Sequence, residues 1–220
     1  MFQYLAGAAP GRSLAWDCAT GNGQAARGLA PFFERVIATD ASSSQIAAAQ
    51  PVDGIEFREA PAEHSGLDEG SIDLITVAQA LHWFDIEKFF AESRRVLRDG
   101  GIVAVWSYAR NRVNSDCDPI VSRMFEEVED FWPPERAIVE NNYRDIDLPF
   151  TELSAPLFEM SVSWTADDML GYFRTWSASQ RYLRERHADP VATIESALRL
   201  AWGSQRRDVR WPLNLRVGRK

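Results

Sequence analysis

The sequence predicts an α/β fold with a doubly wound, parallel sheet, and three observations lead to this fold class. Short apolar runs alternate with longer amphipathic segments in the first half of the chain, which is typical of a sheet with helices on both faces. The runs VIATD, DLITVA and GIVAVW are almost continuously apolar, as strands buried on both faces should be. A turn that contains Gly21 and Gly23 follows an earlier apolar run, LAWD, at a place where folds of this class bind ligands.

The elements of the first half follow in order from these patterns. Five strands are expected, at Ser13–Asp17, Arg35–Asp40, Ile55–Glu59, Ile72–Ala78 and Ile102–Ser107. Three helices are expected between them, at Gln24–Ala30, Ser43–Gln50 and Asp85–Arg98. Asp85 is suited to cap the start of the last helix, and Gly100-Gly101 is expected to end it.

The second half of the chain is less regular. We expect one amphipathic helix at Pro119–Phe131, a strand at Leu157–Trp164, two helices at Ala166–Ser177 and Pro190–Trp202, and a last strand at Leu213–Val217. A separate core between residues 109 and 156 would be very small. We therefore interpret residues 1–220 as a single domain that carries a variable, substrate-side insertion at about 109–156.

Composition excludes several classes of function. The 220 residues include 32 acidic and 24 basic side chains, and a net charge of −8 disfavours a nucleic-acid-binding surface. The two cysteines, Cys18 and Cys117, show neither a metal-ligand spacing nor a disulfide framework. No apolar run approaches the ~20 residues of a membrane span, and no signal peptide is visible. We expect a cytoplasmic protein that contacts neither membrane nor nucleic acid and is a monomer or a homodimer.

The glycine turn and an acid on the next strand suggest a cofactor that contains adenosine. Gly21 and Gly23 permit close approach of a ligand to the backbone. The helix that starts near Gln24 directs free N–H groups at the same place. Asp40 ends the next strand, where a carboxylate can accept both ribose hydroxyls.

Two cofactors, and a turn without any ligand, are compatible with this pattern. The segment GNGQAA matches the dinucleotide pattern G-x-G-x-x-G/A, which would make the chain an NAD-dependent oxidoreductase. Asp17 argues against that, because a carboxylate at the strand end repels a diphosphate. The ammonium and sulfonium groups of S-adenosylmethionine suit it better. In the simplest alternative, the glycines only shape a connection between strand and helix.

Four motifs resemble those of a known family in order and spacing. The segments DCATGNGQ, VIATDAS, EAPAEHSGLDEGSIDLITVAQALHWFD and RVLRDGGIVAVW resemble class I S-adenosylmethionine-dependent methyltransferases. They are most similar to the small-molecule type 11 group, which includes trans-aconitate methyltransferase-like proteins. The resemblance covers Leu14 to Tyr108, and the segment Thr175–Tyr182 extends it towards the C-terminus.

The resemblance implies a Rossmann-like sheet of seven strands, mostly parallel, with one antiparallel edge strand. It also implies a cofactor site: Asp17, Ala19, Gly21 and Gly23 around the methionine part, Asp40 at the ribose, Ala41, Ala62 and Glu63 at the adenine, and Ala78 and Gln79 near the amino-acid end. Two departures stand out. Family members carry a glycine at position 19, and a few dozen residues that form a lid precede the position of Met1–Ala9.

Methyl transfer from a sulfonium needs alignment and exclusion of water more than it needs acid–base groups. His82 is the candidate catalytic residue, because it could take a proton from a hydroxyl or amine, but it could also be structural. Trp83, Tyr108 and Arg181 are candidate substrate contacts. Arg181 would clamp a carboxylate, unless SQRYLRER is simply a solvated helix face. Further candidates in the variable region are Asn111, Arg144, Trp176 and Tyr182.

Three functions follow from these patterns. The first is a methyltransferase that uses S-adenosylmethionine, with no metal, to methylate a small molecule such as a carboxylic acid. The second is the NAD-dependent oxidoreductase. The third is a protein that binds S-adenosylmethionine without catalysis, a reading that an absent lid would favour.

Overall fold

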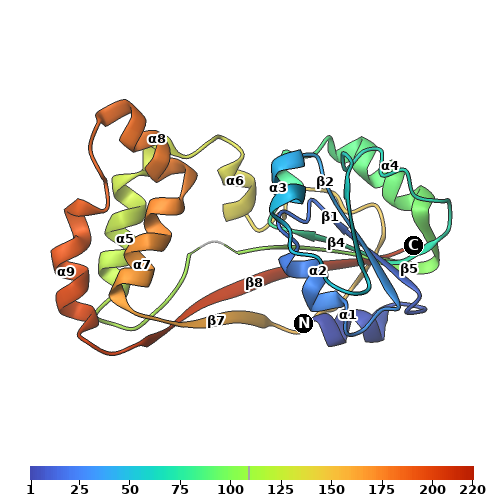
Figure 1. The fold of residues 1–220 in the computed structure, drawn as a ribbon, viewed down its shortest axis with the longest axis horizontal. Helices are drawn as coiled ribbons and strands as arrows, with labels where there is room; N and C mark the ends of the chain where they lie inside the picture. The colour runs from blue at the N-terminus through green and yellow to red at the C-terminus, as the bar shows by residue number, and fades with distance from the viewer. Residues whose placement is uncertain (109) are drawn as a thin grey trace. The chain divides into compact units, whose positions relative to one another are not determined.

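The computed structural model describes residues 1–108 and 110–220 (Figure 1). Compactness divides the chain into two units. The first comprises Met1–Tyr108, Ile138–Phe158 and Leu213–Lys220, and the second comprises Ala109–Ala137 and Glu159–Pro212. The single domain with an insertion at about 109–156 stays a prediction. Among the helices of the described ranges, none is long and apolar enough to cross a membrane.

A mixed sheet organises the first unit. Its strands are β1 (Leu14–Cys18), β2 (Arg35–Asp40), β3 (Ile55–Glu59), β4 (Ile72–Ala78), β5 (Leu97–Ser107), β6 (Thr151–Leu153) and β8 (Arg207–Arg219). The strand order is β3-β2-β1-β4-β5-β8-β6, and β7 (Phe158–Trp164) pairs with β8 off this path. The first five strands are parallel, and β8 runs antiparallel to β5 and β6. The predicted fold class is confirmed, with β6 paired to the outer side of the antiparallel strand.

Each face of the sheet is covered by its own helices. Neighbouring residues of β1 point to opposite faces, so Ala15 and Trp16 belong to different clusters of the core. The cluster around Ala15 includes Leu5 of α1 (Phe2–Ala8) and Leu29 of α2 (Gln24–Leu29). The cluster around Trp16 includes Phe89 of α4 (Ile86–Val96). The sheet is therefore buried on both sides, which explains the continuously apolar strands.

The helix before β5 ends earlier than the sequence predicted. Asp85 caps α4 as expected, because its Oδ1 accepts a hydrogen bond from the Lys88 N–H at 3.3 Å. The helix nevertheless stops at Val96, and Gly100-Gly101 lie inside β5. A Cβ on Gly101 would lie 2.9 Å from the Arg98 carbonyl oxygen. The prediction that the two glycines end the helix was wrong, because Gly100 provides a positive φ of 77° and Gly101 allows close packing at the start of the strand instead.

The remaining short helices of the chain are α3 (Ser43–Ala48), the 3-10 helix η1 (Leu81–Trp83) and α6 (Arg136–Glu140). The second unit is mainly helical, with α5 (Asp118–Glu127), the 3-10 helix η2 (Glu129–Phe131), α7 (Ala166–Thr175), α8 (Ser177–Arg186) and α9 (Ala192–Trp202). The helix predicted at Ala166–Ser177 ends at Thr175, because Trp176 is extended between α7 and α8.

Candidate functional site

The turn between β1 and α2 is tightly built around its two glycines. Gly21 and Gly23 have φ values of 57° and 91°, which glycine adopts without strain. A Cβ on Gly23 would lie 2.6 Å from the ring of Phe57 in β3. Ala19 also lies in the left-handed region, with φ of 53°. Gly23 therefore allows close packing against Phe57, and one left-handed position of the turn is occupied by a residue other than glycine.

Asp40 lies at the carboxyl end of β2, beside this turn. Its Oδ2 accepts a hydrogen bond from the Gly21 N–H at 2.8 Å, and its Oδ1 accepts one from the Ser42 N–H at 2.9 Å. The side chain is only half-buried. An ionised carboxylate has about four lone-pair positions. Asp40 is therefore fixed in orientation and can still accept two further hydrogen bonds.

Asp17 is fully buried beneath the turn. The Thr20 hydroxyl donates to its Oδ2 at 2.5 Å, and the Thr76 hydroxyl donates to its Oδ1 at 2.7 Å. Burial raises the pKa of Asp17 to about 6, although these two hydrogen bonds lower it. The carboxylate holds the turn from inside, because both its oxygens accept hydrogen bonds from neighbouring threonines.

The end of β4 is tied to the end of β5 by a side-chain amide. Gln79 donates from Nε2 to the Tyr108 carbonyl oxygen at 2.9 Å and accepts from the Tyr108 N–H at 2.9 Å. Its backbone is left-handed, with φ of 55°. The amide is thus committed to the backbone of the neighbouring strand. A ligand at this edge would therefore contact the backbone of Ala78 and Gln79 and not the Gln79 amide.

The loop after β3 carries two further residues that the sequence predicted for the site. Ala62 is buried in the core, and Glu63 accepts a hydrogen bond from the Asp85 N–H at 2.9 Å. Ala41 is exposed directly after Asp40. Because the parallel strands all end at the same edge of the sheet, the residues after β1, β2, β3 and β4 lie along one edge.

His82 stands in η1, just past the end of β4, and contacts two aromatic rings. Its ring lies 4.7 Å from that of Trp83, which is 61% exposed. Its Nδ1 lies 3.1 Å from the hydroxyl oxygen of Tyr143, which is fully buried. Tyr143 was not among the residues that the sequence predicted for the site.

The comparisons with known proteins agree with this architecture. A family model described as a methyltransferase domain matches residues 16–105. A protein of Dictyostelium discoideum that is named a methyltransferase is 34% identical over 218 residues, which is 95% of this chain and 83% of that protein. The chain belongs to the class I S-adenosylmethionine-dependent methyltransferases. This membership decides between the two cofactor classes that the glycine turn left open.

Other relatives support the same assignment for this methyltransferase. The solved structure of a protein designated a type II methyltransferase from Anaeromyxobacter dehalogenans has 44% sequence identity and a TM-score of 0.94. That alignment covers 99% of this chain and 94% of the other. A Saccharomyces cerevisiae protein named as dependent on S-adenosylmethionine is 32% identical over 100 residues, which is 42% of this chain and 34% of that protein.

The turn of the methyltransferase fits S-adenosylmethionine on its own geometry. Asp40 keeps two unused lone-pair positions, enough for a pair of hydroxyl groups, while the Gly21 and Ser42 amides hold it in place. The buried Asp17 carboxylate places negative charge beneath the turn, as a cationic ligand requires. Within residues 1–108 and 110–220, no group of three or more His, Cys, Asp or Glu side chains is arranged to hold a metal ion.

The predicted substrate contacts are distributed over both units. Tyr108 and Trp83 belong to the first unit, whereas Arg181 lies in the second. Arg181 is exposed on α8, where its Nε donates to Glu185 Oε1 at 2.7 Å. That is the arrangement of a solvated helix face, and its role as a carboxylate clamp stays a prediction. Of the further candidates, Arg144 is exposed and Tyr182 donates from its hydroxyl to Glu127 Oε1 at 2.9 Å.

Aromatic side chains dominate the core of the second unit. Trp176 is 8% exposed, and its ring centroid lies 4.5 Å from that of Phe125 and 5.4 Å from that of Trp132. Asn111 is 4% exposed, and neither its Oδ1 nor its Nδ2 has a hydrogen-bond partner in the described part of the chain. An unpaired buried amide of this kind is costly unless a ligand or water satisfies it.

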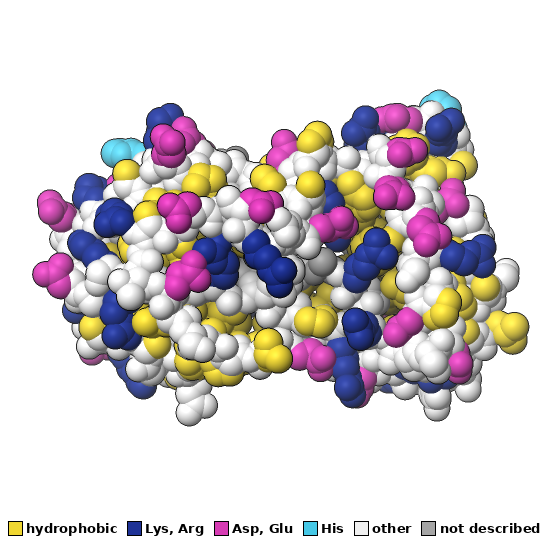
Figure 2. Space-filling view, turned by 180° about the vertical axis from the view of Figure 1, so that it is seen from behind, with side chains coloured by type: hydrophobic (Ala, Val, Ile, Leu, Met, Phe, Trp, Pro, Cys, Tyr) yellow, Lys and Arg dark blue, Asp and Glu magenta, His cyan; other side chains and the backbone are white. Residues whose placement is uncertain are grey.

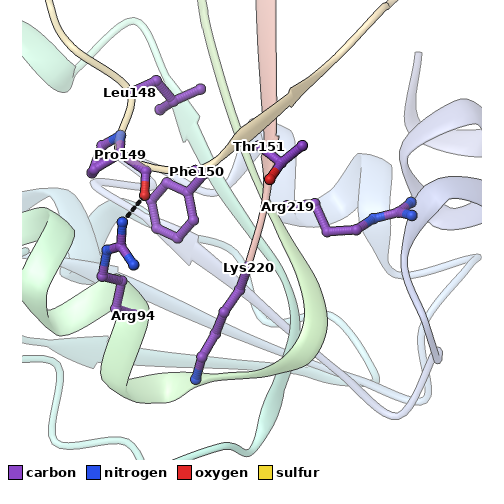
Figure 3. A pocket seen from close by; sticks show the side chains of 7 residues that line it. All are labelled: Arg94, Leu148, Pro149, Phe150, Thr151, Arg219 and Lys220. Atoms are coloured by element: carbon purple, nitrogen blue, oxygen red, sulfur yellow. Dashed lines mark hydrogen bonds between the residues drawn. The ribbon is translucent and has the colours of Figure 1, made fainter.

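A cavity of about 390 Å³ lies elsewhere in the first unit and differs from this site (Figure 3). Its lining residues are Arg94, Leu148, Pro149, Phe150, Thr151, Arg219 and Lys220. Arg94, Arg219 and Lys220 each donate to a backbone carbonyl oxygen, of Pro149, Ala8 and Leu97 respectively. The cavity is next to the start of β5, whereas ligands of this fold class bind at the other ends of the parallel strands.

Proposed function

We propose that this methyltransferase transfers the methyl group of S-adenosylmethionine to a small molecule of the carboxylic acid class. The observation that carries the cofactor site is the Asp40 carboxylate, which two backbone amides orient at the strand edge with hydrogen-bonding capacity to spare. We infer that this capacity is used by the two ribose hydroxyls.

The proposed cofactor site follows the edge of the sheet. Its residues are Asp17, Ala19, Gly21, Gly23, Asp40, Ala41, Ala62, Glu63, Ala78 and Gln79. Ala19, Gly21 and Gly23 have left-handed backbones, and the methionine part is proposed to lie against this turn. Ala41 and the loop with Ala62 and Glu63 flank the adenine, and the backbone at Ala78 and Gln79 faces the amino-acid end.

The cofactor supplies an activated methyl group, whose carbon is attacked in line with the bond to sulfur. The protein has to orient the methyl acceptor and exclude water. We propose that His82, Trp83 and Tyr108 do this, because they come from η1 and from the end of β5, directly after the two strands that Gln79 ties together. The 61% exposure of Trp83 leaves an apolar surface available to a substrate.

A small methyl acceptor suits the surface better than a nucleic acid does. Acidic and basic side chains are interspersed on the face drawn in Figure 2, and the net charge of the chain is −8. A nucleic acid would require a clustered basic surface.

Calorimetric titration with S-adenosylhomocysteine tests the cofactor site. We expect binding by the wild type and a loss of about 10- to 100-fold in affinity for Asp40→Ala, because charge-assisted hydrogen bonds contribute about 1.5–3 kcal/mol. Asp40→Asn retains an acceptor for the turn and separates misfolding from lost binding. Asp53→Ala, in an exposed loop, is the matched control. Unchanged affinity in Asp40→Ala would contradict the ribose assignment.

Transfer of a labelled methyl group tests the reaction. The full-length protein is incubated with methyl-labelled S-adenosylmethionine and a panel of small carboxylic acids, phenols and amines. We expect label in the methyl ester of at least one acid. Label in phenols or amines alone would overturn the proposed acceptor class while leaving the cofactor site intact.

A further inference from the structure

Tyr143 reaches His82 through a specific helix ending. Helix α6 stops with the Tyr143 N–H bonded to the Ile138 carbonyl oxygen at 3.1 Å and the Asn142 N–H bonded to that of Val139 at 2.9 Å. This pair of bonds is the Schellman motif, with asparagine in the left-handed position that glycine usually occupies. Asn142 and Tyr143 both have φ of 58°, which is strained for residues with side chains.

Several contacts hold this strained turn in place. Arg216 in β8 donates from Nη1 to the Tyr143 carbonyl oxygen at 2.6 Å and to that of Ile146 at 2.7 Å. The Tyr143 ring is fully buried in the core cluster that also contains Leu81. The surroundings therefore fix the position of the phenol.

The direction of the hydrogen bond between Tyr143 and His82 follows from this burial. A buried phenol proton needs an acceptor, and the structure gives it His82 Nδ1 at 3.1 Å. Burial raises the pKa of Tyr143, while hydrogen bonds from the backbone at Leu81 and His82 to the phenol oxygen lower it. Because His82 Nδ1 lies at hydrogen-bond distance from this buried hydroxyl, we infer that the hydroxyl donates to Nδ1. The phenol remains protonated at neutral pH, as this direction requires.

We propose that Tyr143 is a positioning residue that holds His82 as the neutral tautomer protonated at Nε2, so that His82 does not act as a general base. Nδ1 is engaged by the Tyr143 hydroxyl, and Nε2 already carries the ring proton. The proposal rests on the proposed methyl transfer and narrows its substrate to acceptors that are ionised before they bind.

A carboxylate meets this requirement. Its oxygen forms the new O–C bond while the C–S bond breaks and its electron pair stays on sulfur. The products are a methyl ester and S-adenosylhomocysteine, and no proton has to be removed. An alcohol or a protonated amine would have to release a proton, and general-base catalysis of that step is typically worth 10²–10⁴-fold.

Nitrogen NMR of the full-length protein reads the tautomer without any methyl acceptor. The chain has three histidines, and His82→Gln identifies the His82 signals by their loss. In long-range ¹⁵N–¹H spectra at neutral pH we expect an unprotonated Nδ1 and a protonated Nε2. In Tyr143→Phe we expect a mixture of tautomers. A protonated Nδ1 in the wild type, or the same tautomer in Tyr143→Phe, would overturn the proposal.

A matched control removes a different phenol of the same unit. The Tyr4 hydroxyl donates to the Ser154 carbonyl oxygen at 2.9 Å, remote in sequence from His82, and Tyr4→Phe should leave the His82 signals unchanged. The wild-type spectrum alone shows which ring nitrogen of His82 carries the proton, even if Tyr143→Phe folds poorly. Titration with S-adenosylhomocysteine is independent of the tautomer, so failure of the proposed function is distinguishable from failure of this inference.

Paired substrates test the consequence for catalysis. Carboxylic acids are compared with the alcohols and amines of the same carbon skeleton, in wild type and in Tyr143→Phe. We expect each acid to be methylated about 100-fold faster than its alcohol and amine by the wild type. An alcohol or amine that is methylated faster than its acid would show that a base is present.

Discussion

Strained residues gather beside the proposed site. Five described residues other than glycine have positive φ, and three of them are Ala19, Gln79 and Tyr143. Ala19 shapes the turn after β1, Gln79 joins the ends of β4 and β5, and Tyr143 contacts His82. Such strain costs of order 1–3 kcal/mol per residue and persists only where surrounding contacts enforce it. Part of the free energy of folding therefore offsets backbone strain at this edge of the sheet.

Relief of that strain at Ala19 gives the first prediction. The left-handed backbone costs an alanine roughly 1–2 kcal/mol, and glycine avoids this at some expense in unfolded-chain entropy. Ala19→Gly should therefore raise the free energy of unfolding by about 0.5–1 kcal/mol, measured by urea denaturation. Ala25→Gly, in the adjacent helix α2, should instead lower it by about 1 kcal/mol. A loss at both positions would show that the Ala19 backbone is not strained.

Asp17 gives the protein a pH dependence of unusual sign for a carboxyl group. Its pKa is about 6 in the folded protein, against 3.8 as the reference value. Between these values the folded state binds the proton more tightly, so the free energy of unfolding falls as pH rises through this window. Above pH 6 the free energy of unfolding is lower by about 3 kcal/mol than it is below pH 3.8.

Asp17→Asn should remove this slope, because the amide does not titrate. Urea midpoints at pH 4.5 and pH 6.5 compare the two proteins. We expect the wild type to lose more stability than the variant over this interval. Equal slopes for both proteins would mean that the Asp17 carboxyl is ionised across the whole range.

At the scale of elements, one buried carboxylate holds the loop after β3 onto helix α4. Glu92 accepts hydrogen bonds at Oε1 from the Ser65 N–H and hydroxyl, at 2.9 and 2.5 Å. Arg95 donates to both of its oxygens at 2.8 Å. The loop carries Ala62 and Glu63, so this network positions the proposed adenine edge. Although burial alone would raise the pKa of Glu92, the hydrogen bonds from Arg95 and Ser65 hold it at about 2.

Glu92→Gln should lower the free energy of unfolding by about 2 kcal/mol at pH 7, because charge-assisted hydrogen bonds are lost. The stabilising contribution of Glu92 in the wild type is lost as pH falls from 4.5 towards 2, since a carboxyl with a depressed pKa stabilises the folded state only while it is ionised. Urea denaturation at pH 7 and pH 3 should therefore show a smaller difference at pH 3. Glu87→Gln, exposed on the same helix, is the control and should change little at either pH.

The sequence predicts elements well where a local pattern of residues decides them. Strands Ile55–Glu59 and Ile72–Ala78 were predicted with the bounds that β3 and β4 have, because apolar runs between turns decide them. Gly100-Gly101 misled the prediction, since glycine signals both a helix end and close packing. Helix α6 and Tyr143 were missed. The available signal was Asn141-Asn142 after RAIVE, a sequence compatible with a Schellman ending, but the partner His82 is 61 residues away.

At the scale of the whole molecule, the proposed site depends on segments that are distant in sequence and meet in the sheet. Strand β8 pairs with β5 and also carries Arg216, whose guanidinium donates to carbonyl oxygens 70 and 73 residues earlier. The same side chain forms an ion pair with Glu152. The last strand therefore anchors the turn that places Tyr143 against His82.

Arg216→Lys tests this dependence. Lysine keeps the charge but cannot span both carbonyl oxygens and the carboxylate, because it lacks the planar fork of the guanidinium. We expect a loss of about 2 kcal/mol in the free energy of unfolding and faster amide hydrogen exchange at Tyr143 and Ile146. Arg219→Lys, which disturbs one exposed bond to Ala8, should leave exchange at these two amides unchanged. If exchange increased only along β5 and β8 in Arg216→Lys, the anchor would belong to the sheet itself, and the turn around Tyr143 would be held by α6 and the core alone.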